Sequence, residues 1–321
     1  MTGTDAMTAE PPVTVIVATR NRPELLGQAL DSILGQRYAG DIDVLVVFDQ
    51  CEPDHDLVVE DAHRAVHVTT NNRKPGLAGA RNTGIAAASG EALAFCDDDD
   101  LWSPGKIEAQ VALLRDDPAL EFVTSGLFIE AGHRTSIRVL DRDRITFAEL
   151  IHSRVMEAHP SGYLVKRSAV VGPNDDLDHP GDGIGAVDET LPGSYAEDYD
   201  WILRAARRAD VGAVRLPLVK VKWHRSSFFA ERWETIFSAL QHLVDAHPEF
   251  QRDRAGLARI EGQQAFALAA LGRKDEARSL ARRTLGHNRR ERRAWLALLI
   301  STGLVPADVV VRAVQATGRG I

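Results

Sequence analysis

The sequence predicts an α/β protein with a mostly parallel sheet flanked by helices, followed by an α-helical C-terminal extension. Three observations lead to this prediction. Apolar segments of strand length alternate with helical segments from Val13 to Cys96. Such alternation is typical of parallel strands joined by right-handed crossovers. The fourth strand ends in four consecutive aspartates, at the edge where open α/β sheets bind ligands. From about Phe228 onward, the pattern is wholly helical.

The individual elements follow from apolar spacing and from turn residues. Val13–Thr19 is an uninterrupted apolar run and predicts a buried strand. Pro23–Leu34 is amphipathic, with proline in its first turn, and predicts a helix. The other expected elements of this half are strands at Asp43–Asp49, Val66–Thr70 and Ala92–Cys96, a weakly periodic helix at Asp54–Ala65, and a small-residue helix at Leu77–Ala88.

Composition places the chain among soluble globular proteins of one or two domains, with 321 residues, 44% hydrophobic and 26% charged. Residues 1–12 contain no apolar run, so we expect a disordered leader and not a signal peptide. No stretch approaches the roughly 20 apolar residues of a membrane span. Two cysteines, Cys51 and Cys96, lack metal-binding spacing and favour a reducing cytoplasm.

Charge is distributed unevenly along the chain. The net charge of −8 argues against general nucleic-acid binding. Residues 251–321 contain 14 Lys+Arg and 6 Asp+Glu, so this region carries +8 and the remainder −16. The aspartate run therefore lies in the acidic part, and the C-terminal region is a separate basic one.

The aspartate run Asp97–Asp100 predicts a divalent metal site. Adjacent carboxylates repel one another unless a cation lies between them. If strand geometry continues past Cys96, Asp97 and Asp99 point the same way and can share one ion. Runs of acids are more commonly solvated loops, but this one follows a buried strand directly and leads into Leu101 and Trp102. An EF-hand is excluded because the glycine it requires is replaced by Trp102.

Two nucleotide-binding motifs are absent. The first strand ends in Ala18–Pro23 without a G-x-G-x-x-G fingerprint, and the chain has no Walker A lysine loop. If the sheet binds phosphates, it must do so through a metal and side chains.

Five segments in order resemble the family 2 glycosyltransferases, and together they cover about residues 13–227. They match the first strand and turn, the second strand with its terminal Asp, the Ala-Arg-Asn-x-Gly helix, the Asp-x-Asp motif and the acceptor-side Glu-Asp motif. The segments are Val15–Leu26, Val44–Asp49, Gly79–Ile85, Phe95–Pro104 and Ala196–Ala205. A sixth segment, Val219–Ser227, is similar to the family's Tyr-Arg-x-His segment.

The resemblance implies a GT-A, Rossmann-like fold and inverting transfer of a sugar from a nucleoside diphosphate to an acceptor hydroxyl. It implies a nucleotide-binding half at 13–100, an acceptor half at 101–227 and a helical region at 228–321. The expected cofactor is Mn²⁺ or Mg²⁺, since hard oxygen ligands favour these ions over zinc. The expected donor is a UDP-sugar. The acceptor is a carbohydrate, a lipid-linked compound or a small molecule, and the compartment is the cytoplasm or the inner face of its membrane.

Residue roles are carried over position by position. Asp97, Asp99 and His224 are the expected metal ligands, and Asp198 is the expected general base. A single base without a covalent carboxylate partner implies inversion. The expected substrate-binding residues are Thr19, Arg20, Asp49, Arg81, Asp98, Trp102, Glu197, Trp201 and Arg225.

Structural explanations compete with several of these roles. Arg81 could form a surface ion pair, and Glu197 and Asp198 could serve the positive end of a helix running to Arg208. Tryptophan is more often buried than stacked on sugar. The second strand ends in Asp49-Gln50-Cys51 where the family has Asp-Asp-Gly-Ser, a departure that concerns nucleotide identity more than fold. The segment Val171–Ser194 is either a lid over the acceptor or a simple insertion.

Two functions of other classes remain as alternatives. A haloacid-dehalogenase-like phosphohydrolase also uses Asp-x-Asp after an apolar strand, but on the first strand and not the fourth. A non-catalytic interaction protein on the same fold would have no reason to retain Asp97, Asp99 and Asp198 together.

The C-terminal region contains one segment, Gly262–Ala277, that resembles a tetratricopeptide-like helical hairpin, without a clear second copy. Six arginines precede or flank the apolar segment Trp295–Ile300. This basic amphipathic pattern fits peripheral contact with an anionic membrane, a homodimer contact or a solvated helix face. The arginines are Arg282, Arg283, Arg289, Arg290, Arg292 and Arg293.

Overall fold

The computed structural model describes residues 7–132, 134–222 and 232–316. The chain divides into two compact units, which we describe separately. Unit 1 comprises Met1–Phe147, Val155–Glu189 and Glu197–Trp223, and unit 2 comprises Ala148–Arg154, Thr190–Ala196 and His224–Ile321. No sequence pattern indicates that the two short inserts belong to the helical unit.

The N-terminal half of unit 1 forms the parallel part of its sheet, in the order β3-β2-β1-β4. Pairing aligns Thr19 with Phe48 and Ala18 with Asp97, so the carboxyl ends of three strands lie side by side. This confirms the predicted parallel arrangement. The strands are β1 (Val13–Thr19), β2 (Ile42–Phe48), β3 (Arg64–Thr70) and β4 (Ala92–Asp97).

Six further strands extend this sheet in the described part of unit 1, in the order β4-β9-β6-β10-β5 with β7 and β8 at the side. β9 runs antiparallel to both β4 and β6, whereas β10 runs parallel to β6. The mixed direction arises only after the aspartate run. The strands are β5 (Leu101–Trp102), β6 (Phe122–Ala131), β7 (Arg134–Arg138), β8 (Arg144–Ile145), β9 (Leu164–Lys166) and β10 (Val211–Lys222).

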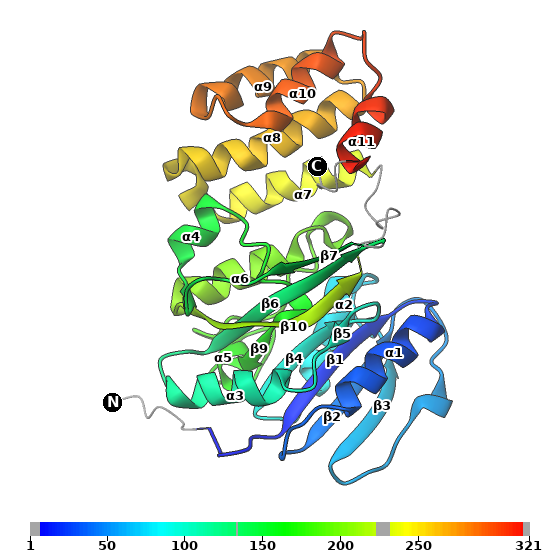
Figure 1. The fold of residues 1–321 in the computed structure, drawn as a ribbon. Coiled ribbons are helices and arrows are strands. Elements are labelled where there is room, and N and C mark those ends of the chain that lie inside the picture. The colour runs from blue at the N-terminus through cyan, green and yellow to red at the C-terminus, as the bar shows by residue number, and fades with distance from the viewer. Residues whose placement is uncertain (1–6, 133, 223–231, 317–321) are drawn as a thin grey trace. The chain divides into compact units, whose positions relative to one another are not determined.

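Helices cover both faces of the sheet. α1 (Pro23–Leu34) and α3 (Lys106–Asp116) pack on one face and lie in front of it in Figure 1. α2 (Leu77–Ala87) and α6 (Glu197–Arg208) pack on the other. α2 approaches β1 so closely that a Cβ at Gly84 would lie 2.5 Å from Ile16 Cγ2, so this crossing requires glycine. The short elements of unit 1 are α5 (Arg167–Val171) and the 3₁₀ turns η1 (His55–Leu57) and η2 (Pro160–Gly162). Those that belong mainly or wholly to unit 2 are α4 (Phe147–His152) and the 3₁₀ turns η3 (Pro192–Ser194) and η4 (Pro248–Arg252).

The prediction of a helix at Asp54–Ala65 is wrong. Only the single turn η1 forms there, after which Val59 pairs with Val66 in an isolated β-bridge. The Asp61 carboxylate accepts the backbone N–H groups two and three residues further on, at 2.8 and 2.9 Å. Aspartate bonds of this kind compete with helical ones and favour a turn.

Residues 7–12 of the expected leader are held against the rest of unit 1, and residues 1–6 lie outside the described residues. Thr8 Oγ1 donates to Glu91 Oε1 at 3.0 Å, and the Tyr38 hydroxyl donates to the Pro11 carbonyl at 2.7 Å. Met7 also packs against the core and Pro11 is buried, but these isolated apolar positions form no periodic pattern that would reveal the segment.

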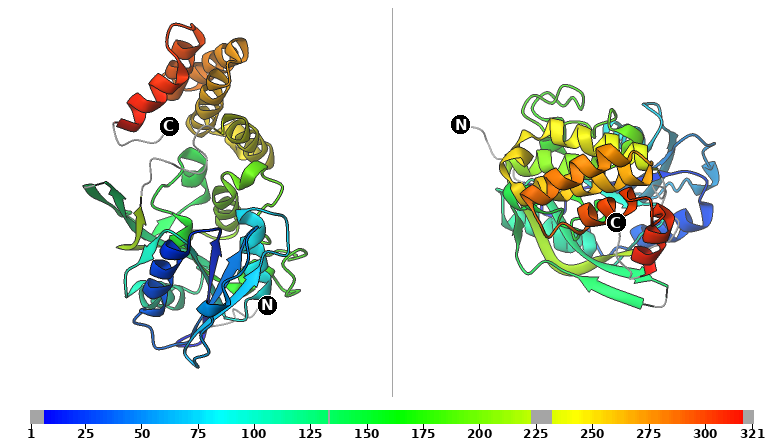
Figure 2. Two further views of the ribbon diagram at one scale, coloured as in Figure 1. Left: turned by 90° about the vertical axis from the view of Figure 1, so that its right-hand side faces the viewer. Right: turned by 90° about the horizontal axis from the view of Figure 1, so that it is seen from above.

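Unit 2 is helical, which confirms the predicted C-terminal extension. α8, α9 and α10 pack side by side around small side chains such as Ala277, Ala281 and Ala294 (Figure 2). None of the described helices combines the length and apolar character that crossing a bilayer requires. The helices are α7 (Trp233–Ala246), α8 (Arg254–Ala270), α9 (Lys274–His287), α10 (Arg292–Ser301) and α11 (Ala307–Ala316).

Candidate functional site

The candidate site lies in unit 1, where β1, β2 and β4 end. Thr19 closes β1, Asp49 follows β2, and Asp97 closes β4. Parallel strands present their carboxyl ends at one edge, and this edge is where open α/β sheets bind ligands. The polar side chains predicted from three separate motifs are therefore brought to one region.

The aspartate run forms a turn rather than a continued strand. β4 ends at Asp97, and the Asp100 N–H donates to the Asp97 carbonyl at 3.1 Å. The four side chains consequently fall into two pairs, Asp98 with Asp99 and Asp97 with Asp100. Arg22 Nη1 donates to Asp98 Oδ1 and to Asp99 Oδ2, each at 3.0 Å. The expectation that Asp97 and Asp99 face a common ion assumed strand geometry beyond Asp97, and the turn removes that geometry.

Ser161 connects the two ends of this turn. Its hydroxyl accepts the Asp97 N–H at 3.0 Å and donates to Asp100 Oδ2 at 2.6 Å. The segment that contains Ser161 is itself held by Trp102 Nε1, which donates to the Ser161 carbonyl at 2.8 Å, and by Gln110 Nε2, which donates to the Gly162 carbonyl at 2.6 Å. Ser161 is completely buried, so the turn has a fixed shape.

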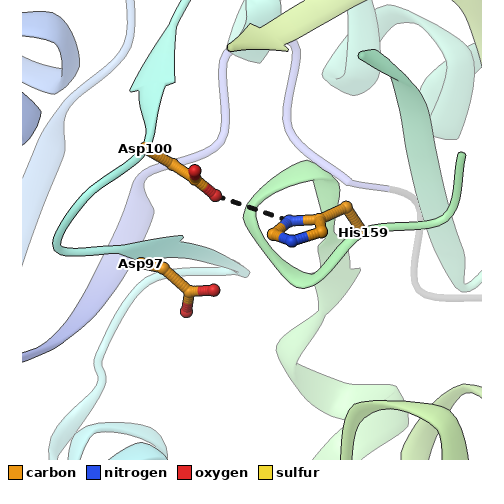
Figure 3. Close-up of side chains that lie close together, drawn as sticks. All are labelled: Asp97, Asp100 and His159. Atoms are coloured by element: carbon orange, nitrogen blue, oxygen red, sulfur yellow. Dashed lines mark ion pairs between the residues drawn. The ribbon is translucent and has the colours of Figure 1, made fainter. Parts of the chain in front are cut away.

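Asp97, Asp100 and His159 form the cluster that can hold a metal ion (Figure 3). One ligand atom from each lies within 4.8 Å of the others, and His159 Nδ1 lies 3.5 Å from Asp100 Oδ2. Ligand atoms around one octahedral cation lie roughly 3–4 Å apart, so small side-chain adjustments suffice. Burial, followed by the charge of Asp97, raises the pKa of Asp100 well above its ordinary value. A cation would relieve this cost, and the two carboxylates of this set suit Mn²⁺ or Mg²⁺.

Arg81 lies within the protein and connects β4 to the first turn of α6. Its guanidinium donates to Asp97 at 2.7 Å and to Glu197, and only 6% of its side chain is exposed. Burial raises the pKa of Glu197 to about 7 although the Arg81 charge opposes the rise. Asp198 also acts on Arg81 electrostatically. Arg81 is thus neither a surface ion pair nor open to a ligand, contrary to both predicted roles.

Asp49 has a different environment from the aspartate turn. Its carboxylate accepts from Asn71 Nδ2 and Gln50 Nε2, each at 2.8 Å, and from the Gly76 N–H at 3.1 Å. Burial would raise the pKa of Asp49, but these donors outweigh it and hold the pKa below its usual value. The carboxylate is therefore fixed and ionised at the end of β2, where a contact with a nucleobase was predicted.

The segment Val171–Ser194 is attached to α2 and the turn before it through its unit 1 residues. Arg73 Nη2 donates to Asp178 Oδ1 at 2.6 Å, and Arg73 Nε also donates to Glu189. Asn82 donates to the Val187 carbonyl and accepts the Val187 N–H, both at 2.8 Å. These contacts favour an insertion that is held in place over a freely moving lid.

The predicted stacking of Trp102 and Trp201 on sugar is contradicted by their burial. Trp102 is 5% exposed and Lys106 Nζ covers its ring at 3.9 Å from the centroid. Trp201 is 2% exposed and packs edge-on against Phe95 with ring centroids 5.2 Å apart. Both rings belong to the core, because each indole N–H finds a backbone carbonyl there.

The remaining predicted residues have mixed placements. Thr19 is buried and its hydroxyl donates to Asp98 Oδ2 at 2.8 Å, so it orients the aspartate turn. Arg20 is exposed beside Asp49 and is open to a ligand. His224 and Arg225 lie outside the described residues.

Sequence reasoning missed three residues that shape the site: Arg22, His159 and Ser161. It considered Asp100 as a contact to sugar or ribose hydroxyls and not as a metal ligand, and Arg22 lies within a quoted motif. His159 and Ser161 flank a Pro in an otherwise unremarked loop. No local pattern distinguishes that loop from others.

A buried lysine lies beneath the aspartate turn. Lys106 is fully buried, and its Nζ donates to Gln110 Oε1 at 2.8 Å. Burial lowers the pKa of Lys106 to about 7, although the nearby Cys96 opposes the change. The amine therefore does little to offset the acidic cluster above pH 7.

Comparison with known proteins gives a consistent picture. Residues 14–161 match the family described as Glycosyl transferase family 2. The *Escherichia coli* protein described as UDP-Glc:alpha-D-GlcNAc-diphosphoundecaprenol beta-1,3-glucosyltransferase WfgD is 31% identical over 102 residues. This match covers 32% of the chain and only 40% of that relative's length.

Two solved structures share the fold. *S. aureus* TarS 1–349 in complex with UDP-GlcNAc matches with a TM-score of 0.59 at 15% identity, over 90% of this chain and 89% of that one. The mannosyltransferase PcManGT from *Pyrobaculum calidifontis*, in complex with GDP-Man and Mn2+, matches with a TM-score of 0.55 at 20% identity, over 97% and 81%. These likenesses show the GT-A fold that the sequence motifs imply.

Proposed function

We propose that the chain is a family 2 glycosyltransferase, the family that residues 14–161 match, and that it transfers a sugar from a nucleoside-diphosphate sugar to an acceptor hydroxyl. One observation supports this proposal most: six carboxyl groups gather around two guanidinium groups at the carboxyl edge of the sheet. The acids are Asp97, Asp98, Asp99, Asp100, Glu197 and Asp198, and the cations are Arg22 and Arg81.

The excess negative charge supports a divalent metal, Mn²⁺ or Mg²⁺. We propose that Asp97, Asp100 and His159 hold it, in place of the predicted set of Asp97, Asp99 and His224. When bound, the cation offsets the negative charge that develops on the departing diphosphate. Asp99 instead pairs with Arg22, an exposed cation that can also turn towards a phosphate.

Asp198 is the proposed general base. It lies in the first turn of α6, 8% exposed, next to Glu197. Neighbouring residues of an α-helix project about 100° apart, so the two carboxyl groups face different directions. Glu197 pairs with Arg81, and Asp198 is the residue proposed to accept the proton of the acceptor hydroxyl. A single base and no covalent partner would give inversion.

For the donor and the acceptor, we propose the class of compound and a few contact residues. Asp49 and Arg20 are proposed contacts to the nucleoside, and UDP is the expected nucleotide because TarS was solved with UDP-GlcNAc. WfgD is described as acting on alpha-D-GlcNAc-diphosphoundecaprenol. This description supports a lipid-linked or other carbohydrate acceptor for the present chain. The cytoplasm is the proposed compartment, in keeping with the two free cysteines.

The proposal is tested by donor binding and turnover. Thermal shifts with UDP-, GDP- and dTDP-sugars, each with and without Mn²⁺, should show stabilisation by one nucleotide class that requires the ion. Asp198→Asn should retain this stabilisation while losing donor turnover by roughly 10²–10⁴. Asp116→Asn, a change at a 72% exposed acid on α3, is the matched control and should behave as wild type.

Two outcomes would reject the proposal. Cleavage of simple phosphate esters without use of any sugar nucleotide would favour the phosphohydrolase alternative. A folded protein that neither binds nor turns over any donor in the panel would favour a non-catalytic role.

A further inference from the structure

The outer side of α10 exposes a row of large apolar side chains. Trp295 is 55% exposed, Leu299 is 43% exposed, and Leu304, in the turn after the helix, is 85% exposed. Trp295 and Leu299 are four residues apart and therefore lie on one side of the helix. Other residues of α10, such as Ala294 and Ala297, are completely buried and face α8 and α9. The exposed row is thus separate from the core of unit 2.

The Trp295 ring is exposed although its polar atom is satisfied. Its Nε1 donates to the Arg289 carbonyl at 3.0 Å, which holds the loop before α10 against the indole. Tryptophan, which combines a large apolar ring with one polar N–H group, is typical of the interface between water and lipid. The hydrogen bond also shows that Arg289 and Trp295 are neighbours in space.

Cations lie at both ends of this row. Arg289, Arg290 and Arg292 are exposed at its start, and Arg292 is three residues before Trp295 on the helix. At the other end, a Cβ on Gly303 would lie 2.8 Å from Lys274 Nζ, so this amine adjoins the turn that leads to Leu304.

Carboxylates do not neutralise this end of unit 2. Arg283 pairs with Glu261 and Arg293 with Glu291, and both of these acids are buried. Among the described residues, we find no carboxylate paired with Arg289, Arg290 or Arg292. The positive charge at the start of the apolar row therefore faces solvent.

We propose that this surface, the α10 face (Arg289, Arg290, Arg292, Trp295, Leu299 and Leu304), docks on an anionic lipid bilayer. Trp295, Leu299 and Leu304 enter the boundary between headgroups and acyl chains, and the arginines contact lipid phosphates. Each interfacial arginine near an anionic membrane contributes about tenfold or less to binding. A second copy fits less well, because an isologous contact would bring two sets of arginines together.

The test is sedimentation of the full chain with vesicles. Binding is expected with vesicles of phosphatidylcholine and phosphatidylglycerol, and not with phosphatidylcholine alone. The emission of Trp295 should shift to the blue, and the shift should be absent in Trp295→Phe. Binding should weaken as salt rises because the surface charge is screened. No donor or metal is required, so this result is independent of the proposed function.

Variants separate the two parts of the α10 face. Replacing Arg289, Arg290 and Arg292 by Gln should weaken binding roughly a hundredfold or more. Trp295→Ser with Leu299→Ser should abolish the remaining binding. The matched control replaces Arg115, Arg142 and Arg215 of unit 1 by Gln, which removes the same charge and should change binding by less than about twofold.

Three results would overturn the proposal. Equal binding to neutral and anionic vesicles would remove the role of charge, and an equal loss in the control variant would remove the role of this surface. Self-association in sedimentation velocity that Trp295→Ser with Leu299→Ser abolishes, without vesicle binding by wild type, would assign the face to a second copy.

Discussion

Asp49 and Asp100 lie at the same edge of the same sheet, but their surroundings affect them in opposite directions. Asp49 accepts three neutral N–H donors and its pKa is lowered. Asp100 is buried among carboxylates, accepts one hydroxyl, and its pKa is raised. The negative charge of Asp49 is already balanced by hydrogen-bond donors, so this position suits a neutral hydrogen-bonding partner. The negative charge around Asp100 is not balanced by nearby donors, so this position suits a cation.

The largest expected effect comes from Asp100→Asn. This change removes a proposed metal ligand, so donor turnover should fall by roughly 10²–10³. Because it also removes a buried like charge, the metal-free protein should melt at a higher temperature than wild type, and addition of Mn²⁺ should no longer raise the melting temperature. If Mn²⁺ still raised the melting temperature of Asp100→Asn, Asp100 would not be a metal ligand and the proposed difference between the two sites would be wrong.

Asp49→Asn should show the opposite pattern. It loses charge-assisted hydrogen bonds, so the free energy of unfolding should fall by about 1–3 kcal/mol. The Mn²⁺-dependent stabilisation should survive, while the KM for the donor rises roughly tenfold. Urea unfolding and initial rates measure the two effects. If Asp49→Asn instead removed the response to Mn²⁺, both acids would belong to one site.

Ser161→Ala should weaken the aspartate turn without removing an acid. The change leaves the Asp97 N–H and the buried Asp100 carboxyl without the hydroxyl that joins them. We expect a loss of about 1–3 kcal/mol in the free energy of unfolding and a rise of roughly tenfold in the Kd for Mn²⁺. Titration of Mn²⁺ by electron paramagnetic resonance reads the second effect directly, and an unchanged Kd would assign Ser161 a purely structural role.

The last effect concerns stability without turnover and comes from Lys106 beneath the turn. With a pKa of about 7 in the folded protein and 10.5 when unfolded, the unfolded state binds more protons between these values. Wild-type stability should therefore rise with pH from 7 upward, by at most about 1.4 kcal/mol per pH unit, and level off below pH 7. Lys106→Met should lack this rise.

The control for this experiment is Lys220→Met, since Lys220 is 41% exposed and should keep the wild-type slope. Urea unfolding at pH 6, 7, 8 and 9 gives the curves. Parallel curves for wild type and Lys106→Met would mean that Lys106 remains charged, in which case it offsets the acids above it.

Most of the fold could be predicted from local sequence. β1 and α1 occur at the predicted residues, Val13–Thr19 and Pro23–Leu34, because apolar spacing and a helix-starting proline determine them. The position of the candidate site at the sheet edge could be predicted, but the contacts between its side chains could not. Where β4 stops depends on its pairing with β1 and on Ser161, 64 residues further along the chain from Asp97. Apolar patterning contains no information on such polar contacts.

The ligand set shows the same limit. His159 reaches the aspartate turn only because Trp102 and Gln110 bind the backbone of its loop. The burial of Trp102 and Trp201 likewise depends on distant carbonyl acceptors. Residue type predicts the acids only as a group, whereas tertiary packing decides which of them lie close together.

Asn82 forms a reciprocal pair of hydrogen bonds with the backbone of Val187, and it directly follows Arg81 in α2. The Asn82 amide thereby makes the same pair of hydrogen bonds to Val187 that a neighbouring β-strand would make. Since Arg81 bonds Asp97 of β4 and Glu197 of α6 from the same turn of α2, this one helical turn ties residues 182–189 to both elements.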